Sequence, residues 1–220
     1  FVVYDQLPLQ RSDCFPAHAY ALFNNWMKAI ASLGNGLICI SRAVEADVRR
    51  HLDTLQVRRK RSIRLGHFHL GADIASSKPS DGLSREQELA VDRLQGARSC
   101  LIVGTVEPRK GHAQTIDAFE LLWTSGAQVK LVLVGKPGWM TDPMAQRIRE
   151  HMENGKRLFW FERASDELLQ RLYTVCTVLL VPSEGEGFGL PLIEASRHGM
   201  PILCRDLPVF REVAGGHASY

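Results

Sequence analysis

From Ser99 to the end of the chain, continuously apolar segments alternate with helix-like segments, and this alternation constrains the fold more than any other feature. The apolar segments are short and apolar at almost every position, which is typical of parallel strands buried on both faces. We expect strands at Leu101–Val103, Lys130–Val134, Leu158–Phe161, Val178–Val181 and Ile202–Cys204. Helices are expected near His112–Trp123, Asp142–Met152, Asp166–Tyr173 and Leu190–His198.

Five β-α units in a row predict a doubly wound, Rossmann-like α/β domain with a parallel sheet. Helix punctuation supports this prediction, because Ser165 is a good N-cap, and Gly199 followed by Pro201 ends the helix that begins near Leu190. In folds of this kind, ligands bind at the carboxyl ends of the strands.

The first part of the chain has fewer elements. We expect a strand at Phe1–Tyr4, a helix at Ala17–Leu33, a strand at Leu37–Ile40 and a helix at Ser41–Leu52 capped by Ser41. This is too little for a complete α/β domain, and the chain begins at Phe1 inside a strand-like run, so we expect a fragment of a longer protein. The predicted division is residues 1–72 as the end of an incomplete second Rossmann-like domain, 73–98 as a linker and helix, and 99–220 as the complete domain.

Composition excludes several classes of protein. The net charge of +3 is too small to indicate a nucleic-acid partner. No apolar run is long enough to span a membrane. The five cysteines are scattered and form no CxxC pair, which favours reduced thiols in the cytoplasm over disulfides or metal ligands.

The strongest motif is the string VPSEGEGFGLPLIEA at 181–195, which follows an expected strand and opens an expected helix. We call residues 182–189 the glycine-rich loop. Its glycines let the backbone approach a ligand closely, and the helix start directs free amide N–H groups at an anion. Glu186 and Glu194 would repel phosphate, so they are better explained as acceptors for the hydroxyl groups of a sugar or a ribose.

The second motif is GTVEPRKG at 104–111, here called the cationic turn, which also connects a strand to a helix. Arg109 can bind phosphate oxygens with two N–H groups at once, and Lys110 supplies a compact positive charge. Alone, this octapeptide is equally compatible with a solvated basic turn. The glycine-rich loop follows another strand of the same sheet and is also suited to anions. We therefore favour one anion site that the turn and the loop share.

Together these strings resemble the C-terminal domain of GT-B glycosyltransferases of family 4, which are retaining enzymes. The resemblance includes the E-x7-E spacing from Glu186 to Glu194, the Pro-Arg-Lys-Gly turn at 108–111, the string VGKPG at 134–138 and ASDEL at 164–168. Weaker similarity at 3–8, 39–42 and 69–73 resembles the end of the family's N-terminal domain.

The resemblance implies a role for each matching residue. Arg109, Lys110 and Glu186 would be the catalytic group: the two cations would stabilise the leaving diphosphate, and Glu186 would face the transferred sugar. Glu194 would bind the ribose hydroxyls, and the segment near Arg163 would flank the base. The full set of expected donor-binding residues is Gly104, Thr105, Arg163, Ala164, Ser183, Gly187, Phe188, Gly189, Leu190 and Glu194.

The sequence also departs from the family pattern. Members often have a histidine before the aspartate of the early motif, where this chain has Tyr4 and Asp5. That histidine is expected further upstream, or Tyr4 occupies its place. The family's N-terminal glycine-rich loop and its closing C-terminal helix are absent from this sequence.

We therefore predict a retaining glycosyltransferase that moves a hexose from a nucleotide-sugar to a glycan or lipid-linked acceptor in polysaccharide biosynthesis. GDP-mannose is the first guess for this co-substrate, and no metal or other cofactor is expected. The predicted location is the cytoplasm, and a basic cluster at 58–61 with Arg64 raises the hypothesis of peripheral contact with the inner face of the membrane.

Three alternatives were considered. A nicotinamide dehydrogenase would carry GxGxxG after the first strand, and a P-loop NTPase would carry GxxxxGK[ST]; neither string occurs. A non-catalytic nucleotide-sugar sensor or scaffold subunit of the same fold stays open at this point.

Overall fold

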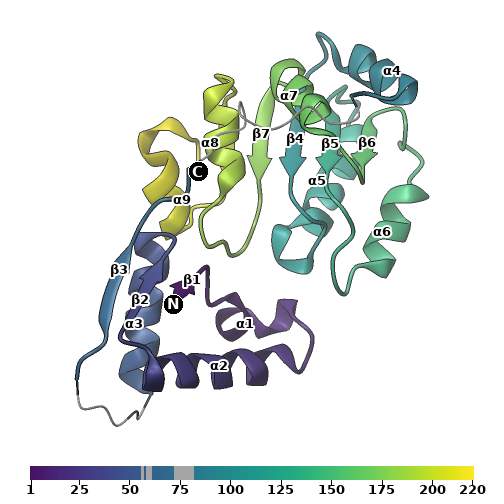
Figure 1. Cartoon of the computed structure of the whole chain (residues 1–220). Coiled ribbons are helices and arrows are strands. Elements are labelled where there is room, and N and C mark those ends of the chain that lie inside the picture. The colour runs from purple at the N-terminus through teal and green to yellow at the C-terminus, as the bar shows by residue number, and fades with distance from the viewer. Residues whose placement is uncertain (56, 58–60, 72–81) are drawn as a thin grey trace.

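The computed structural model describes residues 1–55, 57, 61–71 and 82–220. A five-stranded sheet forms the centre of the larger half of the molecule (Figure 1). Its strands run in the order β6-β5-β4-β7-β8, and every neighbouring pair is parallel. They are β4 (Ser99–Val103), β5 (Lys130–Val134), β6 (Leu158–Phe161), β7 (Val178–Val181) and β8 (Ile202–Cys204).

Helices cover both faces of this sheet. On one face pack α5 (His112–Thr124) and α6 (Asp142–Arg149), around a core that includes Ile102 and Leu133. On the other face pack α4 (Arg85–Leu94), α7 (Asp166–Val175), α8 (Leu190–Arg197) and α9 (Pro208–Ala214), around a core that includes Leu101 and Val132. Adjacent residues of one strand enter opposite cores, so each strand is apolar throughout. The predicted doubly wound α/β fold is confirmed.

The N-terminal segment, residues 1–71, forms a three-stranded parallel sheet in the order β1-β2-β3. Its strands are β1 (Val2–Val3), β2 (Gly36–Cys39) and β3 (Arg64–His67). The helices α2 (Ala19–Leu33) and α3 (Arg42–Thr54) bury Met27, Ile30 and Val48 against them. The short helix α1 (Leu7–Gln10) follows β1. Figure 1 shows this segment below the larger sheet, with α3 beside α9.

The two serines predicted as helix caps do cap their helices. The Ser41 and Ser165 side chains accept hydrogen bonds from Val44 N and Leu168 N at the starts of α3 and α7. Three helices are shorter than expected: α2 begins at Ala19 and not at Ala17, α8 ends at Arg197 and not at His198, and α6 ends at Arg149 and not at Met152. There the Asn154 side-chain amide donates to the Arg149 carbonyl at 2.9 Å, which ends the helix in a turn.

Candidate functional site

The glycine-rich loop and the cationic turn leave adjacent strands. β4 pairs with β7, and both strands end on the same edge of the sheet. From β4 the chain proceeds outward through β5 to β6, whereas from β7 it proceeds the other way to β8. This reversal is a topological switch point, where a crevice opens at the carboxyl ends of the strands. The fold therefore brings the two predicted motifs to the position at which α/β proteins bind ligands.

The two motifs also touch each other directly. The Glu184 backbone N–H donates to the Arg109 carbonyl at 2.8 Å, and Arg109 Nη1 donates to the Gly185 carbonyl at 2.9 Å. Gly111 has a φ of +73°, and a Cβ there would lie 2.7 Å from the Pro182 carbonyl oxygen, so only glycine permits this approach. The loop and the turn thus form one continuous surface.

Glu186 joins both cations of the turn. Its carboxylate lies 2.5 Å from Lys110 Nζ and 3.1 Å from Arg109 Nη1. Arg109 Nε also lies 2.9 Å from the carboxylate of Glu107, which is 6% exposed. Burial alone would raise the pKa of Glu186, but Lys110 and Arg109 outweigh that effect and hold the pKa below its usual value. Glu186 is therefore charged and shields both cations.

Asp5 of the N-terminal segment belongs to the same charge cluster. Burial raises the pKa of Asp5, and the Leu7 amide and the charges of Arg109, Glu186 and Lys110 also act on it. The Tyr4 side chain, in contrast, is 63% exposed. The residue of the early motif that approaches the cations is therefore Asp5. The sequence pattern does not by itself assign Asp5 or Glu107 to the site.

The N-terminal segment also holds the glycine-rich loop. Ser41 Oγ donates to the Gly187 carbonyl at 2.8 Å, and Arg11 Nη2 lies 2.5 Å from the Glu184 carboxylate. A Cβ on Gly187 would lie 2.2 Å from the Tyr4 carbonyl oxygen. Residues more than a hundred positions apart therefore define the shape of the loop, and no local pattern in the sequence marks Ser41 for this contact.

The other predicted loop residues lie around this cluster. The Ser183 side chain is buried and forms a hydrogen bond with Glu186 that helps to lower the pKa of Glu186. Phe188 is buried, while Leu190, the first residue of α8, is exposed. Gly189 has a φ of +93° and precedes α8, so it supplies the left-handed turn that starts this helix.

A hollow of about 500 Å³ collects four further predicted donor-binding residues, Gly104, Thr105, Arg163 and Ala164. Leu169 of α7 forms part of its wall. A Cβ on Gly135, where φ is +146°, would lie 2.1 Å from the Gly104 carbonyl oxygen, so a side chain there is excluded. We call this cavity the base hollow, since its residues include those expected to flank the base.

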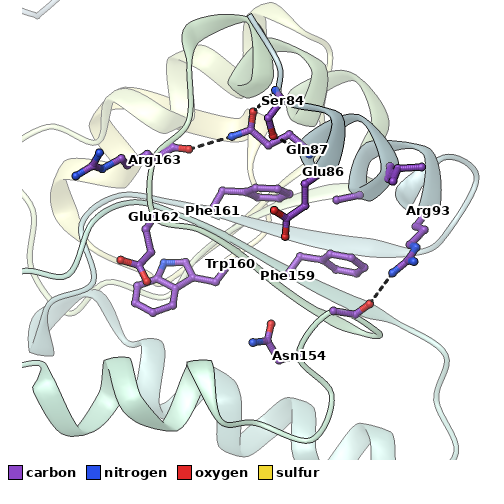
Figure 2. A pocket seen from close by; sticks show the side chains of 13 residues that line it. Ser84, Glu86, Gln87, Arg93, Asn154, Phe159, Trp160, Phe161, Glu162 and Arg163 are labelled. Carbon is purple, nitrogen blue, oxygen red and sulfur yellow. Dashed lines mark hydrogen bonds between the residues drawn. The ribbon is translucent and has the colours of Figure 1, made fainter. Parts of the chain in front are cut away.

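A second hollow lies beyond Arg163, between α4 and β6 (Figure 2). The Gln87 side-chain amide donates to the Arg163 carbonyl at 3.3 Å. Figure 2 shows the Arg163 guanidinium pointing away from the rings of Phe159 and Phe161, which lie under α4. Gln87 thereby connects α4 to the segment that borders the base hollow.

Glu194 lies on α8, and its carboxylate accepts a hydrogen bond from the Tyr173 hydroxyl at 2.6 Å. Trp139 donates its ring N–H to the Cys14 carbonyl at 2.9 Å and stacks on Phe15. It therefore connects the two halves of the molecule.

Two histidines at and after the end of β3 pair with carboxylates. His67 pairs with Glu45 and His69 with Glu212, each at 2.6 Å. The five cysteines are free thiols. Within the described ranges, no group of three or more histidine, cysteine, aspartate or glutamate side chains could hold a metal ion. The basic cluster at 58–61 falls mostly outside the described residues, and so does the predicted boundary at 72–73. No described helix combines the length and apolarity needed to cross a bilayer.

A doubly wound parallel sheet with two interlocked loops at its switch point defines a Rossmann-like α/β domain, and comparison with known proteins places this domain among the glycosyltransferases. The chain belongs to the family "Glycosyl transferases group 1", which matches residues 85–218. Among solved structures, it superposes on sucrose-phosphate synthase from Thermosynechococcus elongatus with a TM-score of 0.71 and 21% identity, covering 96% of this chain and 50% of that one. Anabaena Alr3699/HepE, solved with UDP and glucose, gives a TM-score of 0.65 and 19% identity over 96% of this chain and 54% of that one.

The relatives found by sequence similarity have more specific names than the family. The chain is 41% identical, over its whole length, to the serotype-specific mannosyltransferase WbdA of Escherichia coli, of which it covers 27%. It is 35% identical over 119 residues to O-antigen chain mannosyltransferase B of Escherichia coli, covering 52% of this chain and 30% of that one. The chain thus spans about a quarter of the length of the curated relatives that it matches over its full extent.

Proposed function

We propose that this chain carries the donor site of a retaining mannosyltransferase that uses GDP-mannose to extend a glycan in polysaccharide biosynthesis. One observation carries the proposal: Arg109, Lys110 and Glu186 converge at the switch point, beside a loop whose glycines allow other parts of the chain to approach its backbone closely. The two mannosyltransferase relatives support mannose as the sugar.

The chemistry follows from the charges. The bond between the sugar's anomeric carbon and the diphosphate oxygen breaks, and the diphosphate leaves with the electron pair. Arg109, Lys110 and the amides at the start of α8 stabilise this growing negative charge. The acceptor hydroxyl attacks from the face that the diphosphate leaves, which retains the configuration, and its proton passes to the leaving diphosphate. Glu186 orients the sugar through its hydroxyl groups.

The cations of the chain account for leaving-group stabilisation, and we extend the proposal to a reaction that needs no metal ion or other cofactor. A chelator such as EDTA is then expected to leave turnover unchanged. A loss of activity in EDTA that Mg²⁺ or Mn²⁺ restores would refute this part.

The acceptor in this proposal is a lipid-linked saccharide at the cytoplasmic face of the membrane. Five basic residues within 58–64 support contact with anionic head groups. The protein is then expected to sediment with vesicles containing phosphatidylglycerol and not with pure phosphatidylcholine vesicles. Equal sedimentation with both would contradict the membrane contact.

The proposed function is tested by calorimetric titration with GDP, UDP and dTDP, followed by mannose release from GDP-mannose. We expect binding of GDP alone, and a turnover that Lys110→Ala and Glu186→Ala abolish. Binding of UDP or dTDP in preference to GDP would reassign the donor. Unchanged turnover in both variants would refute the catalytic assignment.

A further inference from the structure

Tyr173 is a buried tyrosine whose hydroxyl contacts a carboxylate. It lies on α7, is 1% exposed, and donates its hydroxyl to Glu194 Oε2 at 2.6 Å. Its ring stacks on His198, with centroids 5.4 Å apart and an interplanar angle of 12°. The ring is thus immobilised on one side, and the hydroxyl is directed at a carboxylate on the neighbouring helix.

The Tyr173 hydroxyl retains its proton and therefore stays a donor. Burial, then the charge of Glu194 and the hydrogen bond itself, raise the pKa of Tyr173. A hydrogen bond from a neutral hydroxyl to a charged carboxylate is stronger than one between neutral groups. The bond therefore holds one oxygen of Glu194 and restricts the rotamers of its side chain.

The position of this pair relative to the two parts of the site indicates what Glu194 faces. Leu169 borders the base hollow, and Tyr173 follows it one turn later on the same helix. Glu194 lies on α8, which begins directly after the glycine-rich loop. The Tyr173–Glu194 hydrogen bond therefore joins the helix that borders the base hollow to the helix that follows the glycine-rich loop. The ribose of a nucleotide likewise joins its base to its diphosphate.

We propose that Tyr173 is a positioning residue for the ribose of the donor. By holding Oε2 of Glu194, it keeps the carboxylate oriented so that its remaining lone pairs accept hydrogen bonds from the ribose hydroxyls. This inference rests on the proposed function, and adds to it a residue outside both sequence motifs that controls discrimination of ribose.

The test compares GDP with 2′,3′-dideoxy-GDP, which lacks the hydroxyls that Glu194 would bind. The wild-type protein is expected to bind GDP more tightly than the dideoxy compound. Tyr173→Phe removes a single oxygen and with it the hydrogen bond to Glu194. The variant is expected to bind GDP about tenfold more weakly, because a tenfold change in the dissociation constant corresponds to about 1.4 kcal/mol of hydrogen-bond energy. Affinity for the dideoxy compound stays unchanged, so the discrimination ratio falls about tenfold.

Tyr220→Phe is the matched control. It also removes one phenolic hydroxyl, which donates to the Gly215 carbonyl at 2.5 Å, away from the site. We expect the control to leave the ratio at the wild-type value. In a Glu194→Gln background, Tyr173→Phe is expected to cause little further loss, because the two residues act as one unit.

The outcomes separate the inference from the proposed function. If the wild-type protein prefers GDP over the dideoxy compound and Tyr173→Phe shows the same preference, Tyr173 has no positioning role. In that case only the inference fails. The same conclusion follows if Tyr173→Phe weakens both compounds equally, since that indicates a general structural role. If the wild-type protein binds no nucleoside diphosphate at all, the proposed function and the inference fail together.

Discussion

Glu186→Gln is expected to strengthen the binding of GDP while it weakens turnover of the sugar donor. Glu186 lies 2.5 Å from Lys110 Nζ and 3.1 Å from Arg109 Nη1. Asp5 and Glu107 add two further carboxyl groups to the same cluster. A diphosphate must therefore compete with Glu186 for both cations. Glutamine keeps the shape of the side chain and removes the charge that competes.

The magnitude follows from the strength of the contacts. A hydrogen bond to a charged group contributes about 1.5–3 kcal/mol, and a neutral one contributes about 1 kcal/mol. The difference gives the diphosphate an advantage of about 0.5–2 kcal/mol, which is about twofold to thirtyfold in the dissociation constant. Lys110→Met removes a cation instead, and is expected to weaken GDP binding by tenfold or more by the same conversion.

Isothermal titration with GDP, at constant pH and ionic strength, measures both variants. Release of mannose from GDP-mannose measures turnover, which is expected to fall in both, because Glu186 orients the sugar and Lys110 stabilises the leaving group. Competition between Glu186 and the diphosphate is refuted if Glu186→Gln weakens the binding of GDP as much as Lys110→Met does. That result would mean that Glu186 supports the diphosphate site and does not compete with it.

Three further substitutions test the surroundings of the site. Since burial raises the pKa of Asp5, the folded state disfavours its charge, so Asp5→Asn is expected to raise the melting temperature at pH 7. The gain should vanish below pH 3.8, the ordinary pKa of aspartate, where the carboxyl group is protonated in both the folded and the unfolded chain. A lower melting temperature of the variant at pH 7 would contradict the prediction. Burial, assisted by Lys110, lowers the pKa of His112 from 6.5 to about 4. The unfolded chain takes up this proton first as the pH falls, so about 3 kcal/mol of unfolding free energy is lost between pH 6.5 and 4. In urea melts, the unfolding free energy of His112→Asn should fall less steeply over this pH range than that of the wild-type protein. An equally steep fall would argue against His112 as the origin of the loss. In Gly187→Ala, the added Cβ would lie 2.2 Å from the Tyr4 carbonyl oxygen. A cost of about 1–3 kcal/mol in unfolding free energy, together with weaker GDP binding, is expected; wild-type values in both measurements would show that the loop adapts freely.

The strands of the larger sheet could be predicted closely from the sequence. Lys130–Val134 and Leu158–Phe161 agree with the structure at both ends, because apolar residues on both faces mark a strand covered by two layers of helices. Helix ends were less certain. The end of α6 at Arg149 depends on the Asn154 side chain, a contact that apolar periodicity does not reveal.

The candidate site divides in the same way. Arg109, Lys110 and Glu186 were found because each lies in a short motif after a strand, and parallel strands bring such loops to a common edge. Their mutual distances were not predictable, and neither was the neutralisation of both cations by Glu186 and Glu107. Local sequence encodes which groups are present near a strand end, and not which of them form ion pairs.

The sequence alone predicts the α/β architecture, the capping residues Ser41 and Ser165, and the two motifs of the site, because these depend on side chains close together along the chain. The contacts of Asp5 and Ser41 with the glycine-rich loop, and that of Tyr173 with Glu194, follow from the folded arrangement. These contacts join residues 21 to more than a hundred positions apart. They form because the packing of helices and sheets places them within hydrogen-bonding distance, which no local pattern records.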